Sequence, residues 1–376
     1  MSAPLRILHC QSTFSPGGKE IRTVKLMNAF GKKLHHTIVS GQPDQIGARA
    51  LIDRKVSASF PTDFPSLKGS PTPGRLITIA KALAGYDLIL TYNWGAMDVV
   101  MAHTIFAQNL GLPPLIHHED GFNEDEAFQL KSSRNWFRRV ALWRTQRLVV
   151  PSRVLENIAL NTWKQPRDRV RRIDNGIDIS AFSKAPNPNA IRVVKREGEK
   201  WVGTLAGLRA VKQLPLLVSA MTHLPENWHL VILGDGPEKE TILEAARSAE
   251  ISHRVHLPGA IKDPASVIGL FDIFALSSKS EQFPISVVEA MAAGLPIAAP
   301  DVGDISTMIA TSNAPFVAER DSSESLGLKL KELCENDELR AQIGADNKDK
   351  AAKFFDEAQM FSAYRTLYGE AMGQSF

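Results

Sequence analysis

Short apolar runs bounded by turn residues recur along this chain and alternate with helical patterns. The first run, residues 5–8, is followed by the turn Ser15-Pro-Gly-Gly18, a helical pattern over residues 19–34 and a second apolar run over residues 36–40. Strand, glycine turn, helix and strand in this order are typical of a parallel βαβ unit. Apolar runs without alternation also indicate strands covered on both faces. This pattern restricts the fold to the α/β class.

The same cycle continues through the first half and starts again in the second. We predict strands over residues 87–92, 114–117 and 148–150, and then over residues 200–205, 229–233, 255–257, 271–276 and 296–299. Helical patterns cover residues 214–221, 238–248, 284–293 and 357–372. The chain is therefore expected to hold two consecutive Rossmann-like, doubly wound parallel-sheet units.

The boundary between the two cycles is predicted from composition. Residues 185–190 are rich in proline and asparagine, and we interpret them as an interdomain linker. The 376 residues suffice for two domains with separate cores. We predict an N-terminal domain over residues 1–185 and a C-terminal domain over residues 191–356.

The bulk composition argues against several classes of protein. Apolar residues make up 44% and charged residues 23%, the net charge is +3, and Cys10 and Cys334 are the two cysteines. These values do not indicate nucleic-acid binding, a disulfide framework or a zinc cluster. We find no signal-peptide pattern and no apolar run long enough to span a membrane. We expect a cytoplasmic protein, with any membrane contact peripheral and at the inner face of the cytoplasmic membrane.

Three segments of the second half follow predicted strands, at the edge where open α/β sheets bind ligands. The first is Glu281-Gln-Phe-Pro-Ile-Ser-Val-Val-Glu289, in which a loop enters a helix whose first amides and positive dipole suit a diphosphate. Glu289 could bind both ribose hydroxyls, and Glu281 could contact a sugar. By spacing alone, two surface glutamates flanking a helix start are the favoured interpretation.

The other segments supply cations and glycine turns. Residues 203–212 carry Arg209 and Lys212, which could bind phosphate. Residues 234–237 form a Gly-Asp-Gly-Pro turn that permits close approach of a ligand, and Gly17-Gly18 could do the same in the first half. Each segment taken alone is also explained by a structural turn or by solvated charges.

Together these segments resemble glycosyltransferase family 4, whose members have the GT-B fold of two Rossmann-like domains facing a central cleft. The resemblance covers nearly the whole chain and is strongest over residues 175–303. Six segments follow the family's order: Gly17-Gly-Lys-Glu20, Val150-Pro-Ser152, Asn175-Gly-Ile-Asp178, residues 202–212, residues 233–237, and residues 281–296, which contain the E-x7-E signature.

The resemblance implies a retaining enzyme that moves a sugar from a nucleotide-diphosphate donor to a carbohydrate or polyprenyl-diphosphate-linked acceptor, in bacterial cell-surface polysaccharide or glycolipid assembly. Glu281 would approach the donor sugar, Glu289 would bind ribose, and Lys212 would neutralise the leaving diphosphate. No metal or other cofactor is expected, and the helix of residues 357–376 would return to the acceptor-binding N-terminal domain. The donor-binding residues implied besides Glu289 are Gly17, Gly18, Gly203, Gly234, Phe283, Pro284, Ile285 and Ser286.

The sequence departs from the family pattern at several positions. The usual arginine five residues before the lysine is Gly207 here, so Arg209 is the nearest cation; Gln282 and the pair Gly303-Asp304 also differ. An N-terminal-domain histidine often faces the reacting sugar. At this strand end, His117-His-Glu-Asp-Gly121, either His118 or Asp120 occupies that position, and we assign His118 the catalytic role. A buried histidine without a catalytic role is the alternative.

A basic and aromatic segment is the candidate acceptor side. Residues 131–147 hold six basic residues together with Trp136, Phe137 and Trp143. Such a helix could lie on an anionic membrane or bind a phosphate-rich acceptor. It could equally pack its tryptophans into the domain and leave its arginines solvated. A second basic cluster, residues 167–172, reads by default as a solvated charge run.

Two other functions remain open from the sequence. The departures at Gly207 and at the histidine position are compatible with a nucleotide-sugar-binding protein without transferase activity, or with a GT-B nucleotide-sugar epimerase. A nicotinamide oxidoreductase would carry G-x-G-x-x-G after the first strand and an acidic residue about 20 positions later. This sequence has neither feature.

Overall fold

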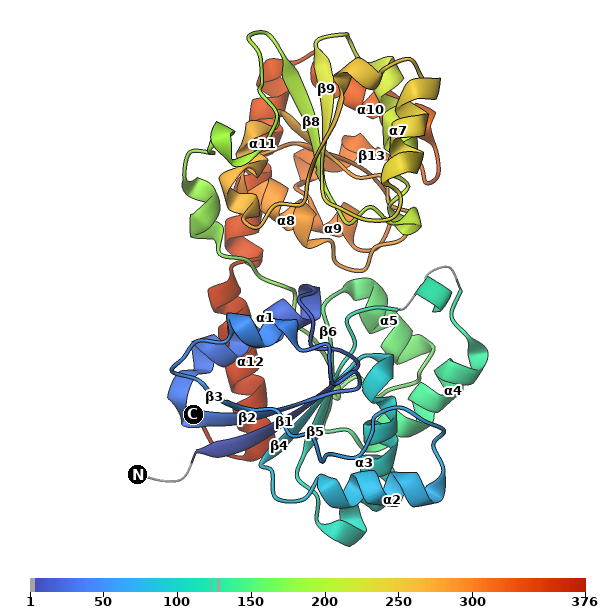
Figure 1. The fold of residues 1–376 in the computed structure, drawn as a ribbon, viewed down its shortest axis with the longest axis vertical. Coiled ribbons are helices and arrows are strands. Elements are labelled where there is room, and N and C mark those ends of the chain that lie inside the picture. The colour runs from blue at the N-terminus through green and yellow to red at the C-terminus, as the bar shows by residue number, and fades with distance from the viewer. Residues whose placement is uncertain (1–3, 123, 127–128) are drawn as a thin grey trace. The chain divides into compact units, whose positions relative to one another are not determined.

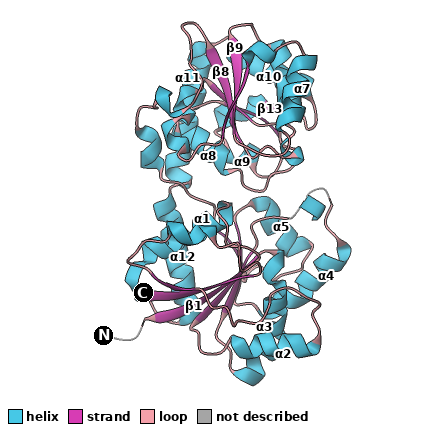
Figure 2. Ribbon diagram, in the orientation of Figure 1, coloured by secondary structure: helices cyan, strands magenta, loops and turns pink. Residues whose placement is uncertain are grey.

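The computed structural model describes residues 4–122, 124–126 and 129–376, whose contacts form two compact units. Met1–Ile173 and Met360–Phe376 belong to the N-terminal unit, and Asp174–Gln359 make up the C-terminal unit. Each unit is a parallel sheet with helices on both of its faces (Figures 1 and 2). The predicted pair of doubly wound α/β units is therefore confirmed.

The N-terminal sheet has the strand order β3-β2-β1-β4-β5-β6-β7, with all neighbours parallel. Its strands are β1 (Leu5–Gln11), β2 (Leu34–Ser40), β3 (Ser57–Ser59), β4 (Leu88–Tyr92), β5 (Leu115–His118), β6 (Arg147–Val150) and β7 (Val170–Arg172). β1 pairs with β2 on one side and with β4 on the other. The winding direction reverses between β1 and β4, and open α/β sheets bind ligands at the carboxyl ends of strands at such a point.

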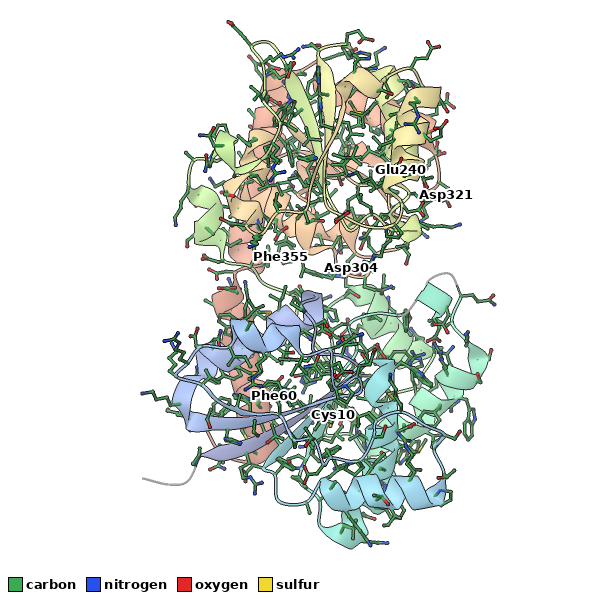
Figure 3. All side chains as sticks on the ribbon, viewed as in Figure 1. Cys10, Phe60, Glu240, Asp304, Asp321 and Phe355 are labelled. Carbon is green, nitrogen blue, oxygen red and sulfur yellow. The ribbon has the colours of Figure 1, made fainter. Side chains whose placement is uncertain are left out.

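Two helical layers bury this sheet. Its helices are α1 (Gly18–Phe30), α2 (Pro73–Ala82), α3 (Met97–Leu110), α4 (Ser132–Ala141), α5 (Arg153–Asn161) and α12 (Glu357–Met372). Because strand residues alternate between faces, Ile7 packs with α1 and α12, while Leu8 packs with α2 and α3. Cys10 lies in the same layer as Leu8, inside the core (Figure 3). The last helix of the chain is thus part of the N-terminal core.

The C-terminal sheet has the order β10-β9-β8-β11-β12-β13 and is also parallel. Its strands are β8 (Lys200–Leu205), β9 (Trp228–Leu233), β10 (Val255–Gly259), β11 (Ile273–Ala275), β12 (Ile297–Pro300) and β13 (Val317–Ala318). Its helices are α6 (Leu214–Ala220), α7 (Lys239–Ser248), α8 (Ile285–Ala292), α9 (Ile305–Met308), α10 (Ser323–Cys334) and α11 (Asp337–Phe354). The winding reverses between β8 and β11, so the loops that follow these strands lie at the ligand-binding edge.

The chain passes between the units at two places that lie side by side. The amide of Ile177 donates to Phe355 O and the amide of Glu357 donates to Ile177 O, both at 2.9 Å. Gly176 permits this approach, because a Cβ there would lie 2.6 Å from Glu357 Cα. The expected linker, residues 185–190, packs instead on the C-terminal unit, where Asn187 N donates to Ser266 O at 2.7 Å. Proline and asparagine indicate irregular backbone, and such a composition does not distinguish a linker from a surface loop packed on one unit.

Candidate functional site

Three loops meet at the carboxyl ends of β8, β9 and β11. The amide of Lys279 donates to Val211 O at 2.9 Å, and Ser277 Oγ donates to Lys212 O at 2.9 Å. The loop after β9 comes equally close, because a Cβ on Gly234 would lie only 1.8 Å from Ala206 O. Gly234 therefore serves the packing of one loop on another.

An ion pair joins two of the predicted catalytic residues at this edge. Lys212 Nζ contacts Glu281 Oε1, and Ser278 Oγ donates to the same carboxylate oxygen at 2.7 Å. The lysine and glutamate side chains are 16% and 10% exposed, so the pair is accessible along one side. An ammonium group has three donors, and further donors remain for an anion after one has bound Glu281. The sequence did not single out Ser278, which fixes the carboxylate.

Helix α8 begins next to this ion pair. Pro284 is its N-cap, and the proline side chain offers no acceptor to the first amides. The amides of Ile285 and Ser286 lie in the first turn, where backbone N–H groups have no intrahelical partner. Glu289 follows one turn later and is partly buried. The start of α8 thus has the geometry that binds phosphate groups in other proteins.

Two residues assigned to donor binding have packing roles. The ring of Phe271 fills the space beside Gly203 in β8, where a Cβ would lie 2.0 Å from a ring carbon. Phe283 is 9% exposed, and its ring packs edge-on against Phe355 with 5.7 Å between centroids. Gly203 is therefore required by the Phe271 ring, and the ring of Phe283 belongs to the core. Phe355 is marked in Figure 3.

The departures from the family pattern have structural counterparts. Arg209 is exposed, and its Nε lies 3.6 Å from the place of a Cβ on Gly207, so its side chain folds over the glycine. Gly303 has φ +59° and approaches the backbone of Glu281, whose carbonyl oxygen would lie 2.5 Å from a Cβ there. Asp304 follows as the N-cap residue of α9 (Figure 3). The turn at Gly303 therefore positions the loop that carries Glu281.

His118 lies inside the N-terminal core. It is 1% exposed, its Nδ1 donates to Thr91 O at 3.3 Å, and its Nε2 accepts from Tyr368 Oη at 2.9 Å. Burial, followed by the charge of Arg22, lowers the pKa of His118 to about 3. Both ring nitrogens are used by α12 and the neighbouring strand. The catalytic assignment of His118 therefore conflicts with its geometry, because β5 still has sheet alternation at this residue and directs the ring into the layer of α12.

Asp120 lies beyond the end of β5 and binds Arg22 of α1. Arg22 Nη2 donates to Asp120 Oδ2 at 2.9 Å, and a second contact joins Nη1 to Oδ1. Asn93, at the end of β4, accepts the amide of Asp120 on its side-chain oxygen at 2.8 Å. Burial raises the pKa of Asp120, but Arg22 outweighs burial and holds this pKa below its usual value. The sequence offered Asp120 as the alternative to His118, and it missed Arg22 and Asn93.

The turn before α1 lies at the same edge. Gly17 is the N-cap of α1, and a Cβ there would lie 2.8 Å from Glu20 Oε2. Glu20 accepts from Thr13 Oγ1 at 3.1 Å and pairs with Lys19. Gly18 is exposed and has open space around it. Gly17 is thus required by a buried carboxylate, whereas Gly18 leaves room for a ligand.

A cavity of about 390 Å³ opens at the carboxyl edge of the N-terminal sheet. It is lined by Ser12 after β1, by Gly41 after β2, by Trp94 after β4, by Phe137 of α4 and by part of the loop over residues 67–71. This volume lies within the range of small-molecule sites, and aromatic walls with a few polar groups are typical of them. Among the described residues, no group of three or more His, Cys, Asp and Glu is arranged to hold a metal ion.

Comparisons with known proteins agree with this architecture. The sequence model of Glycosyltransferase Family 4 matches residues 16–181, and that of Glycosyl transferases group 1 matches residues 188–350. GDP-mannose-dependent alpha-mannosyltransferase of Mycolicibacterium smegmatis is 28% identical over 295 residues, covering 76% of this chain and 74% of that protein. N-acetyl-alpha-D-glucosaminyl L-malate synthase of Bacillus anthracis is 26% identical over 178 residues, 47% of each protein.

A solved structure supports the fold. Anabaena HepE in complex with UDP has a TM-score of 0.80 and 18% identity, covering 97% of this chain and all of that one. The two doubly wound units and this likeness define the GT-B fold. The two sequence models together account for most of residues 16–350, and the chain belongs to glycosyltransferase family 4.

Proposed function

We propose that this protein transfers a sugar, with retention of configuration, from a nucleotide-diphosphate donor to an acceptor. The acceptor would be a carbohydrate or a polyprenyl-diphosphate-linked sugar of bacterial cell-surface assembly. The observation that carries the proposal is the Lys212–Glu281 ion pair beside the first turn of α8. Two similar proteins support the donor class by their names: one is GDP-mannose-dependent, and the other is solved with UDP.

The donor half of the reaction follows from the chemistry of this edge. The first amides of α8, near Ile285 and Ser286, would hold the diphosphate, and the carboxylate of Glu289 would bind the ribose hydroxyls. The bond between the anomeric carbon and the diphosphate oxygen breaks, and its electron pair stays on the diphosphate. Lys212 and Arg209 then stabilise the charge that develops on the leaving group. We propose that these cations replace a metal ion and that no cofactor is required.

The acceptor half lies on the N-terminal unit. The acceptor hydroxyl oxygen bonds the anomeric carbon on the face that the diphosphate left, and its proton passes to the leaving diphosphate oxygen. We propose that the cavity lined by Trp94 and Phe137 binds the acceptor, because apolar sugar faces stack on aromatic rings. Asp120, held by Arg22, then takes the strand-end position that we first assigned to His118.

The proposal is tested by incubating the protein with a panel of UDP, GDP and ADP sugars and measuring the nucleoside diphosphate that is released. Lys212→Met is expected to lower kcat by about 10²- to 10³-fold, since it removes charge stabilisation in the transition state. Glu289→Gln is expected to weaken donor binding about tenfold, seen as a smaller thermal shift with the same donor. Chelating agents should leave the rate unchanged.

The controls are the neighbouring residues Lys239 and Glu240 at the start of α7, which are exposed on the same unit (Figure 3 marks Glu240). Lys239→Met and Glu240→Gln should leave release and thermal shift unchanged. If none of the nucleotide sugars raises the melting temperature of the protein, the proposal is refuted. Tight donor binding without transfer to any acceptor would identify a binding protein, and conversion of the donor into its epimer would identify an epimerase.

A further inference from the structure

The outer face of α4 carries two tryptophans in solvent. Trp136 is 67% and Trp143 is 65% exposed, whereas Ala141 between them is fully buried. Trp136, Arg139 and Trp143 are spaced as i, i+3 and i+7, so they form one stripe along α4 and the 3₁₀ turn that continues it, Leu142–Arg144. The expectation that these tryptophans pack into the domain is wrong. Exposing two such large apolar side chains on one stripe calls for a partner.

The basic residues of this segment divide into two groups. Lys131 binds Asp125 at 2.6 Å, Arg134 binds Glu126 at 3.0 Å, and Arg138 binds Glu126 at 2.9 Å while stacking on Trp94. These three cations are neutralised by carboxylates of the preceding turn and stabilise the unit. Arg139 and Arg144 are exposed, and within the described part of the chain they have no carboxylate partner.

A cation from the second basic cluster joins this face. Arg169 donates from Nη1 to Trp143 O, and Gln165 Nε2 donates to Arg139 O at 3.3 Å. The segment before β7 therefore lies against the end of α4. We call the group Trp136, Arg139, Trp143, Arg144 and Arg169 the α4 surface. It combines two exposed indoles with three cations, although α4 and the segment before β7 are separated in sequence.

We propose that the α4 surface binds the anionic lipid surface of a membrane. Indole rings prefer the headgroup region, where one part of the ring is apolar and its N–H remains hydrated. Arginine near an anionic bilayer gains about 1 kcal/mol per residue. Within the described residues no helix is long and apolar enough to cross a bilayer, so the contact is at the lipid surface.

The same helix connects this surface with the acceptor cavity. Phe137 lines the cavity on the inner side of α4, and its neighbour Trp136 lies on the outer side. A membrane bound at the α4 surface would hold a lipid-linked acceptor close to the cavity. This part of the inference rests on the proposed function, whereas lipid binding itself does not.

Sedimentation of the full chain with vesicles tests the proposal. Vesicles of phosphatidylglycerol and phosphatidylcholine in equal parts should bind the protein, and phosphatidylcholine alone should not. Arg139→Gln with Arg144→Gln should lower the partition coefficient about 25-fold, at about fivefold per cation. Trp136→Ser with Trp143→Ser should lower it at least tenfold. The matched control is Lys353→Gln with Phe354→Ser, an exposed cation and aromatic ring on α11, which should change nothing.

The outcomes separate this inference from the proposed function. Equal binding to both vesicle types, binding unaffected by the α4 substitutions, or equally tight binding to soluble polyphosphate would each overturn the membrane proposal. All four substituted positions are exposed, and each variant should keep the thermal shift produced by the donor. Loss of vesicle binding with that shift intact supports the membrane surface. A protein that binds vesicles but no nucleotide sugar would refute only the sugar-transfer proposal.

Discussion

At the scale of single residues, Arg209 lies close to the position where the family usually has an arginine and this chain has Gly207. The family's arginine would stand at residue 207, yet the side chain of Arg209 folds over that glycine, with Nε 3.6 Å from the missing Cβ. The Arg209 side chain thus passes beside the Cβ position of residue 207, although it starts two residues later. Among the described residues, and apart from the chain neighbours, Arg209 and Asp235 O are the groups within 4 Å of that Cβ.

Moving the arginine from residue 209 to residue 207 tests whether the two positions are equivalent. Arg209→Ala is expected to lower kcat with the best donor about 10²-fold, because one of two cations on the leaving diphosphate is lost. Adding Gly207→Arg to the same protein should restore at least a tenth of the original rate. The single variant Gly207→Arg, with Arg209 still present, serves as the control for distortion of the loop. Full activity of Arg209→Ala would remove Arg209 from the mechanism.

The histidine position illustrates which site residues the sequence could predict. The position of Lys212, Glu281 and Glu289 at one sheet edge was predictable because each lies in a segment of defined order and spacing, and their roles toward a donor stay predictions. The choice between His118 and Asp120 was not, since it depends on where β5 ends and on which face each side chain enters. Arg22 could have been noticed only as a charge on the inner side of the α1 pattern, and its partner is 98 residues away.

At the scale of elements, β1, β2, β4, β5 and α12 share a buried polar network. His9 bonds His36 at 2.9 Å and Tyr92 at 3.1 Å, and His118 bonds Tyr368 of α12. Burial is the largest cause of the low pKa of all three histidines, which reaches about 3 for His36 and His118. The network therefore requires neutral imidazoles between the sheet and its covering helix.

This network predicts that the N-terminal unit is destabilised by acid. The folded-state pKa values lie below the unfolded value of 6.5, so the unfolded chain binds more protons as the pH falls below 6.5. Stability is then full above about pH 7 and is lost progressively toward the folded pKa of about 3, by about 2 kcal/mol per histidine between pH 7.5 and pH 5. The protection of β1, β2 and α12 against hydrogen exchange, relative to the intrinsic exchange rate at each pH, should fall in this range.

The C-terminal unit provides the internal reference for that measurement. Its pair His229–His256 is only partly buried, so exchange in β9 and β10 should respond less to pH. His36→Gln removes one titrating group and should reduce the pH slope by about a third, whatever it does to stability at neutral pH. Equal acid sensitivity of the two units would contradict this account.

The sequence predicted the buried strands accurately but missed a polar strand at the sheet edge. The apolar runs at β8 and β9 gave strands within a residue of their observed bounds, because both are buried on two faces. β3, Ser57–Ser59, escaped prediction because it is a polar three-residue strand at the edge of the sheet. Its pairing with β2 is made by the backbone and by polar side chains, such as His35 with Ser57 and Ser59, which leave no apolar pattern in the sequence.

At the scale of the whole molecule, the last helix stabilises the first unit. Met360, Tyr364, Leu367, Tyr368 and Phe376 are buried in one cluster with Ile7 and Phe30. Each such side chain contributes about 1.5–3 kcal/mol, so the group is worth about as much as the net stability of a domain. The core of the N-terminal unit is therefore incomplete without residues 360–376.

Removal of α12 should affect the two units differently. A chain ending at residue 356 is expected to lose the folded N-terminal unit, seen as rapid proteolysis and fast exchange in β1, while the C-terminal unit keeps its donor-dependent thermal shift. Leu367→Ala is the milder variant and should cost about 2–5 kcal/mol. Its neighbour Thr366 is exposed, and Thr366→Ala should be neutral. Unchanged protection of β1 in the truncated chain would refute this dependence.

The sequence by itself determined the α/β class, the two doubly wound units, the family and the segments that meet at the carboxyl edge of the C-terminal sheet. These follow from local patterns, since apolar period, turn residues and order along the chain need no knowledge of distant contacts. The tertiary structure decided what depends on side chains far apart in sequence: the Lys212–Glu281 ion pair, the burial of His118 under α12, and the exposure of Trp136 and Trp143. Alternation in a strand and the face of a helix can be predicted locally, but which face meets a partner is decided only by packing.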